Sequence, residues 1–242
     1  MNRFFAFGCS FTNFVYPTYA DLLSLNFDFY QNWGQGGAGN QFIFNSIIEA
    51  NQRYRFDAND TIIVQWTNTG REDRYLHKGW IGDGNIYSQL TYDDEWVKKF
   101  VTERGCIIRD FAFIQAVYLL LSNIKCNFKF ISMVPLSKHD EWVDYDNEKT
   151  NNDVYQLYSK VLQEIRPSYY EVIYKKQWST EMYHNGKPRD SHPSPNEHLE
   201  YIRQVLPEFT ITDAMKDLAE KESLQFFNNQ QSKFSRQRLL RL

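Results

Sequence analysis

Cysteine is scarce in this 242-residue sequence, which contains only Cys9, Cys106 and Cys126. An odd number of widely spaced cysteines, without a CxxC pair, predicts neither a disulfide framework nor a cysteine-based zinc site. Free thiols in a reducing compartment are the simplest explanation of this pattern. We therefore expect a cytoplasmic protein.

Long apolar runs and an excess of basic residues are also missing. The first residues lead directly into a predicted strand, so we expect no signal peptide. No apolar run approaches the length of a membrane span, and we expect none. The formal net charge of −3 gives the whole chain no electrostatic reason to bind nucleic acid. Only residues 228–242 form a basic, amphipathic tail, which could dock on a protein partner or mediate homo-oligomerisation.

The length fits one large α/β domain, and the alternation of apolar runs with helical patterns supports that class. The predicted strands are residues 4–7, 27–33, 61–66, 127–134 and 171–174. The clearest helical patterns begin at residues 41, 94, 154 and 194, and the one from 94 to 123 is expected to break near Gly105. We predict a parallel sheet of about five strands in a single domain, residues 1–227.

Residues 72–92 lack a clear period and are rich in glycine, aspartate, tyrosine and tryptophan. We expect an insertion over one edge of the sheet, where it could act as a lid that shapes a substrate site. An ordinary surface excursion would have the same composition.

Ser10 follows the first predicted strand and the flexible residue Gly8. Ligands of open parallel sheets bind outside the carboxyl ends of the strands, so the Ser10 hydroxyl is placed where a substrate would lie. A serine at such a turn can also be a simple helix cap. Distant segments favour the first interpretation.

The second predicted strand ends in residues 34–39, where four of six positions are glycine. These glycines do not follow the G-x-G-x-x-G spacing, and the lysine of a phosphate-binding P-loop is absent, so no nucleotide cofactor is expected. A glycine here instead lets a backbone N–H approach a substrate oxygen closely.

Asn68 follows the third predicted strand, and Asp190 and His192 precede a predicted helix near the end of the chain. A serine nucleophile needs a base, a group that orients the base, and donors for the oxyanion. These residues supply each part, and they map to one rim of the predicted sheet. His184, Asp190 and His198 could be drawn as a metal cluster, but their spacing matches no HExxH pattern, so we expect no metal.

This arrangement resembles the SGNH, or GDSL-like, hydrolase family of esterases, lipases, thioesterases and carbohydrate deacetylases. Residues 8–11 resemble its first block, which implies that Ser10 is the nucleophile. Residues 32–37 resemble the second block, which implies that the Gly37 N–H belongs to the oxyanion hole. Residues 190–193 resemble the last block, which implies that His192 is the base and Asp190 its orienting partner. The resemblance also implies a flavodoxin-like, three-layer α/β/α fold.

Three segments, residues 7–12, 32–40 and 65–67, resemble the corresponding segments of a subgroup found in bacteria and their phages, whose members generally have no assigned substrate. Two departures from the family pattern stand out. Residues 66–69 lack the glycine and the second acid of the third block, so Asn68 is the nearest candidate, with Thr69 and Asn40 as alternatives. Only one residue separates Asp190 from His192, where the family has two, and a backbone carbonyl could take over the orienting role.

The leading hypothesis is a metal-independent serine hydrolase of carboxylic esters that needs no cofactor. Ser10 would attack the acyl carbon, His192 would move the proton, and Asp190 would hold the imidazolium. The Ser10 and Gly37 N–H groups and the Asn68 amide would stabilise the oxyanion. Four residues near the rim are candidate substrate contacts: Tyr16, Trp33, Trp66 and Arg71. The three aromatic ones favour an O-acetylated or otherwise acylated glycan over a long-chain lipid, and Arg71 could hold an anionic or sugar substrate. The competing hypothesis is a non-catalytic SGNH-like module that binds glycan or forms part of a virion or surface-polymer pathway.

Overall fold

The computed structural model describes residues 1–77, 79–88, 92–136, 152–175, 183–184, 187–188 and 192–228. Its central sheet has four parallel strands in the order β2-β1-β3-β6. They are β1 (Arg3–Phe7), β2 (Phe29–Asn32), β3 (Thr61–Trp66) and β6 (Asn127–Ser132). This is the flavodoxin-like order through four strands, and it puts the topological switch point between β1 and β3.

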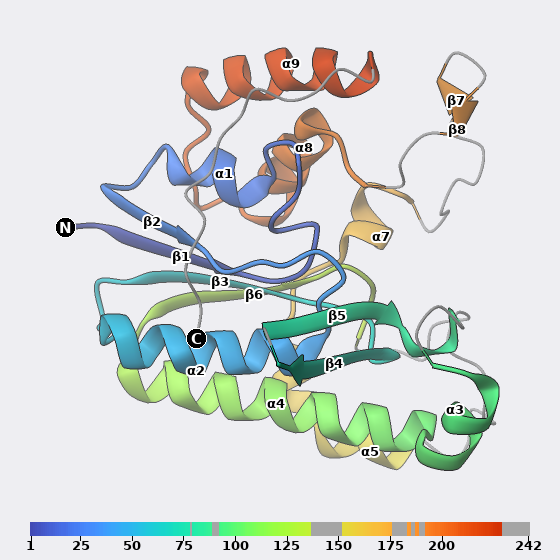
Figure 1. Ribbon diagram of the computed structural model, residues 1–242. Helices are drawn as coiled ribbons and strands as arrows, with labels where there is room; N and C mark the ends of the chain where they lie inside the picture. Colours follow the sequence, from blue (N-terminus) through green and yellow to red (C-terminus); the bar gives the residue numbers. More distant parts are fainter. Residues whose placement is uncertain are drawn as a thin grey trace.

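Helices cover both faces of the sheet, as Figure 1 shows. One layer holds α1 (Tyr19–Ser24), α8 (Pro195–Val205) and α9 (Asp213–Phe227). The other holds α2 (Asn40–Tyr54) and α4 (Glu103–Ile124), with α5 (Asn152–Leu157) beside α4. The predicted three-layer α/β/α class is confirmed. The short elements are α6 (Ser159–Leu162), α7 (Tyr169–Val172), β7 (Tyr183–His184) and β8 (Lys187–Pro188).

Aromatic side chains of β1 fill the core on both sides of the sheet. Because successive side chains of a strand point to opposite faces, Phe4 and Phe5 enter different layers. Phe4 stacks on Phe27, with ring centroids 4.9 Å apart, while Phe5 contacts Tyr54 at 5.3 Å. All three cysteines are buried and unpaired. The side chains of β1 thus pack against both helical layers.

Two predictions about secondary structure need correction. Residues 171–174 are not a strand, because α7 begins at Tyr169 with a capping box in which the Ser168 N–H donates to Glu171 (2.9 Å). An isolated parallel bridge between Phe130 and Ile165 occupies the edge beyond β6 instead. The long helical pattern from residue 94 is divided into α3 (Asp94–Phe100) and α4, and Thr102 caps α4. The predicted break is therefore real, three residues before Gly105.

Among the helices that the structure describes, α4 alone is long and apolar enough to cross a membrane by length and composition. The core helices of globular proteins meet the same test, so this is weak evidence for a span. Here Ile107, Phe111, Ile114 and Leu121 of α4 are buried in the core.

The insertion at residues 72–92 contains a hairpin. Its strands are β4 (Arg71–Leu76) and β5 (Gly79–Asn85), which pair antiparallel and are followed by the 3₁₀ turn η1 (Ile86–Ser88). Figure 1 shows the hairpin beside α2 and α4, on their side of the sheet. Its action as a lid stays a prediction. The tail lies outside the described residues, apart from Asn228.

Two glycines provide a matched test of packing at the end of β1. A Cβ on Gly8 would overlap the Thr12 hydroxyl and come within 2.8 Å of the Gln65 side-chain oxygen, whereas a Cβ on Gly36 would meet nothing within 4 Å. We expect Gly8→Ala to lower the free energy of unfolding by about 2 kcal/mol, as overpacking does. Gly36→Ala should change it by less than about 0.5 kcal/mol. Urea titrations of both variants measure the difference, and equal stabilities would contradict the packing described.

Candidate active site

Ser10 lies in a tight turn that begins where β1 ends. The Cys9 carbonyl accepts hydrogen bonds from the N–H groups of Thr12 (3.0 Å) and Asn13 (3.1 Å), which closes the turn. The Thr12 hydroxyl donates to Gln65 at 2.9 Å and so fastens the turn to β3. Ser10 itself is 8% exposed. Its hydroxyl is therefore held at the carboxyl edge of the sheet in a confined position.

The glycine loop, residues 34–39, is bonded directly to the Ser10 turn. The Gln35 N–H donates to the Gly8 carbonyl (3.1 Å), and the Asn13 side-chain amide donates to the Gly34 carbonyl (2.9 Å). Loops that follow neighbouring parallel strands meet at one sheet edge, and these bonds fix how closely they meet. Gly34 therefore lies beside Thr12 and Asn13 of the turn that contains Ser10.

Gly37 adopts a conformation that favours glycine, with φ of +76°. A Cβ there would also overlap the carbonyl oxygen of Gly82 in β5. The N–H groups of Ser10 and Gly37 have no hydrogen-bond acceptor among the described residues. Two unengaged backbone donors at the sheet edge are the kind of group that stabilises an oxyanion.

The hairpin anchors the glycine loop through Asp73, which sequence analysis did not identify. Its two carboxylate oxygens accept hydrogen bonds from the N–H groups of Gly39 (2.7 Å) and Phe42 (2.8 Å). These donors belong to the first turn of α2, where a negative charge is favoured. Burial raises the pKa of Asp73, although the two N–H bonds oppose that shift. The hairpin thus caps the N-terminus of α2, the helix that follows the glycine loop.

Asn40 is buried and serves the scaffold rather than the oxyanion. Its side-chain oxygen accepts from the Thr67 N–H (2.8 Å), and its NH₂ donates to the Thr67 carbonyl (3.0 Å) and to Asp110 (2.7 Å). The amide is consumed by these bonds, so Asn40 cannot replace Asn68. Burial raises the pKa of Asp110 to about 7, against the opposing effect of Arg109, whose Nε donates to it at 2.7 Å.

Asn68 is half-buried in the loop after β3. Its side-chain oxygen accepts a hydrogen bond from the Gly70 N–H at 2.6 Å, a local turn that asparagine commonly forms. That bond uses the oxygen and leaves the NH₂ group as the side chain's donor. Thr69, the other candidate for this role, is buried. The oxyanion role of Asn68 stays a prediction.

His192 packs against the segment that carries Ser10. Its ring stacks on Phe14, with centroids 4.0 Å apart and an interplanar angle of 14°, and it meets the edge of Phe11 at 5.5 Å. The residue stands two positions before Ser194, whose N–H donates to Glu197 (2.6 Å) in the capping box of α8. The structure therefore brings His192 to the Ser10 turn. Asp190 lies outside the described residues, and its orienting role stays a prediction.

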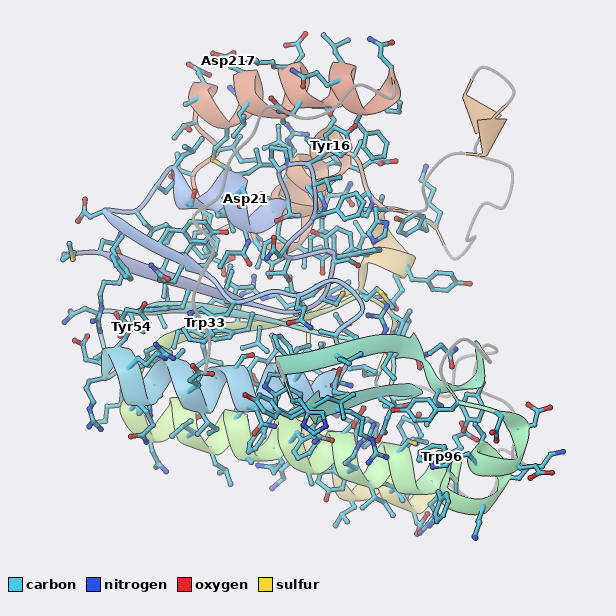
Figure 2. All side chains as sticks on the ribbon, in the orientation of Figure 1. Tyr16, Asp21, Trp33, Tyr54, Trp96 and Asp217 are labelled. Carbon is cyan, nitrogen blue, oxygen red and sulfur yellow. The ribbon has the colours of Figure 1, made fainter. Side chains whose placement is uncertain are left out.

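Trp33 and Trp66 are buried in the core, so neither side chain offers a surface for the predicted substrate contact. Trp33 is 1% exposed and Trp66 is fully buried. Trp33 packs between the sheet and α2, with Tyr54 at 6.4 Å, as Figure 2 shows. Trp66 contacts Phe130 at 5.6 Å. Burying a large aromatic side chain in the core is strongly favourable, which explains why these two residues lie in the core and not at the exposed rim.

The other two candidate substrate contacts have protein partners. Arg71 donates from Nη1 to the Ala38 carbonyl (2.9 Å), so it supports the end of the glycine loop. Tyr16 meets the edge of Phe226 in α9, with centroids 5.0 Å apart, and lies beneath that helix in Figure 2. Both side chains are half-buried, and a substrate role for either stays a prediction.

Histidines near the site do not form a metal centre in the described part of the chain. No three histidine, cysteine, aspartate or glutamate side chains there are grouped so as to hold an ion. His198 is buried in α8, and its Nδ1 lies 2.8 Å from the Tyr169 hydroxyl. This histidine belongs to the core beneath Phe11.

No protein-family model matches the chain, and no curated protein matches it. Solved structures with a similar fold include a lipolytic protein of the G-D-S-L family from Veillonella parvula, with TM-score 0.45, 10% identity, and coverage of 84% of this chain and 97% of that one. A variant of the acetyl xylan esterase Axe2 from Geobacillus stearothermophilus has TM-score 0.47 and 12% identity, covering 87% and 95%. The psychrotrophic esterase EstA from Pseudoalteromonas sp. has TM-score 0.40 and 8% identity, covering 95% and 100%. These similarities concern the fold.

The buried Asp110 gives a pH test of the scaffold beneath the site. Its pKa is about 7 in the folded chain against 3.8 for the ordinary side chain, so the folded state binds more protons between these values. Stability contributed at this position therefore falls as pH rises through that window. We expect wild type to lose stability relative to Asp110→Asn between about pH 4 and 7, and to change little above it.

Urea unfolding at several pH values measures this difference. The Asp213→Asn variant is the control, because Asp213 is fully exposed and its pKa is lowered by Lys216. A wild-type advantage over Asp110→Asn that grew with pH would show that Arg109 outweighs burial, and would contradict the prediction.

Proposed function

We propose that this protein is a serine hydrolase of carboxylic esters, with Ser10 as nucleophile and His192 as base. The observation that carries the proposal is the stacking of the His192 ring on Phe14, four residues after Ser10. Unengaged N–H donors of Ser10 and Gly37 at the same sheet edge support it. Nucleophile, base and oxyanion donors are the three parts that acyl transfer requires.

The reaction proceeds in two halves. His192 accepts the Ser10 proton as Oγ bonds to the acyl carbon, and the carbonyl oxygen becomes an oxyanion held by the two N–H groups and the Asn68 amide. The C–O bond to the alcohol then breaks, and His192 returns the proton to the leaving oxygen. Water repeats the sequence on the acyl-enzyme, which releases the carboxylic acid and restores Ser10. Asp190 would orient the imidazole, and no metal or cofactor takes part.

The confined position of Ser10 favours a short acyl group. The hydroxyl lies in a closed turn, bordered by the glycine loop and by the residues that hold His192. A long acyl chain would need an apolar channel at this point, whereas an acetyl group needs little space. We therefore propose acetyl or similarly short esters, with an O-acetylated glycan as the substrate class.

Hydrolysis of p-nitrophenyl acetate tests the nucleophile. Ser10→Ala should lower kcat/KM by about 10³-fold or more, because loss of a nucleophile removes the covalent route. Ser122→Ala, an exposed serine of α4, is the matched control and should keep the wild-type rate. Added EDTA should leave that rate unchanged. Equal rates for Ser10→Ala and Ser122→Ala would refute the proposed mechanism.

A second test addresses how His192 is held. Phe14→Ala removes the ring on which the imidazole stacks, so the base loses its alignment with Ser10. Small displacements of a catalytic group are costly, and we expect kcat to fall about tenfold or more with a smaller change in KM. Val15→Ala alters the neighbouring exposed side chain and should leave kcat unchanged. If both variants kept full kcat, the Phe14 contact would have no positioning role.

A further inference from the structure

A cavity of about 510 Å³ lies between β4 of the hairpin and the start of α4. Its lining includes Glu72, Arg74, Trp96, Phe100 and Arg109. None of these residues belongs to the proposed catalytic machinery. Figure 2 shows Trp96 on α3, beyond the end of the hairpin. The cavity is large enough for a small ring and has both apolar and charged walls.

Aromatic rings form one wall of this cavity. Trp96 is half-buried, stacks on Tyr92 with centroids 4.4 Å apart, and contacts Phe100 at 5.4 Å. The Arg74 guanidinium lies over the Trp96 ring, 5.4 Å from its centroid. Phe100 is 62% exposed, an unusual cost for a large apolar side chain on a small helix. Exposed aromatic surface beside a cavity favours a ligand that has an apolar face of its own.

The polar wall is electrically balanced. Glu72 accepts from Arg109 Nη1 at 2.6 Å with one oxygen, and its other oxygen lies 3.0 Å from Arg74. Arg109 is also paired with Asp110 at 2.7 Å. An anionic ligand would face the Glu72 carboxylate and would have to compete with it for both guanidinium groups. A neutral ligand with several hydroxyl groups can donate to Glu72 and accept from Arg74 without breaking these pairs.

We infer that this cavity binds a neutral sugar residue of an oligosaccharide. The C–H face of the ring would lie against the exposed Phe100 ring and the edge of Trp96, and its hydroxyl groups would meet Glu72 and Arg74. Arg109 joins the cavity to the catalytic edge of the sheet, since its Nη2 donates to the Arg71 carbonyl at 2.9 Å. The site would thus hold one part of a glycan at the rim that carries Ser10. This binding does not require that Ser10 be catalytic.

Binding of unsubstituted hexasaccharides to the full chain tests the inference. The probes are xylohexaose, cellohexaose, maltohexaose and chitohexaose, which contain no ester for Ser10 to cleave. Calorimetry should show saturable binding of at least one. The indole N–H resonance that is missing from the spectrum of Trp96→Phe should shift with the same probe in wild type. Ser10→Ala should bind equally well, so failure of the hydrolase proposal would leave this result unchanged.

Variants locate the bound sugar. Trp96→Ala and Arg74→Ala should each weaken binding about tenfold, as expected for loss of one aromatic or hydrogen-bonding contact. Tyr75→Ala is the matched control, because Tyr75 neighbours Arg74 on β4, is exposed, and does not line the cavity. Arg74→Ala decides the matter if Trp96→Ala fails to fold, since the Arg74 side chain is half-exposed.

Three outcomes would overturn the inference. The first is the absence of binding by all four neutral hexasaccharides. The second is binding that Trp96→Ala, or Arg74→Ala in its place, leaves as strong as the Tyr75→Ala control does. The third is a shift of the Trp96 resonance by sodium benzoate or oligogalacturonate but by none of the neutral sugars, which would assign the cavity to anions.

Discussion

Close contact between the ends of β1 and β3 is the constraint on which the site depends. Gly8 has no side chain, and the space is taken by the Thr12 hydroxyl and the Gln65 side chain. The hydrogen bond between those two residues fastens the turn, which the Cys9 carbonyl closes, to the neighbouring strand. The Gly8 carbonyl remains available to the glycine loop through Gln35. The position of Ser10 therefore follows from backbone packing rather than from contacts of its own side chain.

The sequence predicted the parts of the fold that depend on dense apolar runs. The strand containing Ile62 is buried throughout, and the strand containing Phe4 is buried at every position after Arg3; such runs are typical of parallel sheets covered on both faces. The same reasoning failed at residues 171–174, because a run of a few apolar residues fits a strand or a helix equally well. The capping pair Ser168 and Glu171 was the decisive signal there, and it is present in the sequence.

The candidate site was predicted only in part. Ser10, Gly37 and Asn68 each follow a strand, so their common edge could be inferred from topology. The roles of Asp73 and Asn40 in anchoring the loops could not be inferred in this way. Their partners lie between 27 and 70 residues away in the chain, and nothing in a polar residue's neighbours indicates that tertiary packing will bury it. The predicted roles of Trp33 and Trp66 were wrong because a tryptophan at the end of a strand can equally well be buried in the core.

The attachment of the hairpin has an evolutionary consequence. Both of its strands are joined to the rest of the chain. In β4, Asp73 bonds to α2 and Glu72 to Arg109, and in β5 the Gly84 N–H donates to the Gly37 carbonyl at 3.2 Å. Changes to β5 at Gly82 or Gly84 would therefore move the glycine loop, whereas Gly79, at the far end of the hairpin, has open space around it and can change without disturbing the backbone that surrounds Ser10. A lineage of such proteins could therefore vary the tip of the hairpin while the backbone around Ser10 stayed the same.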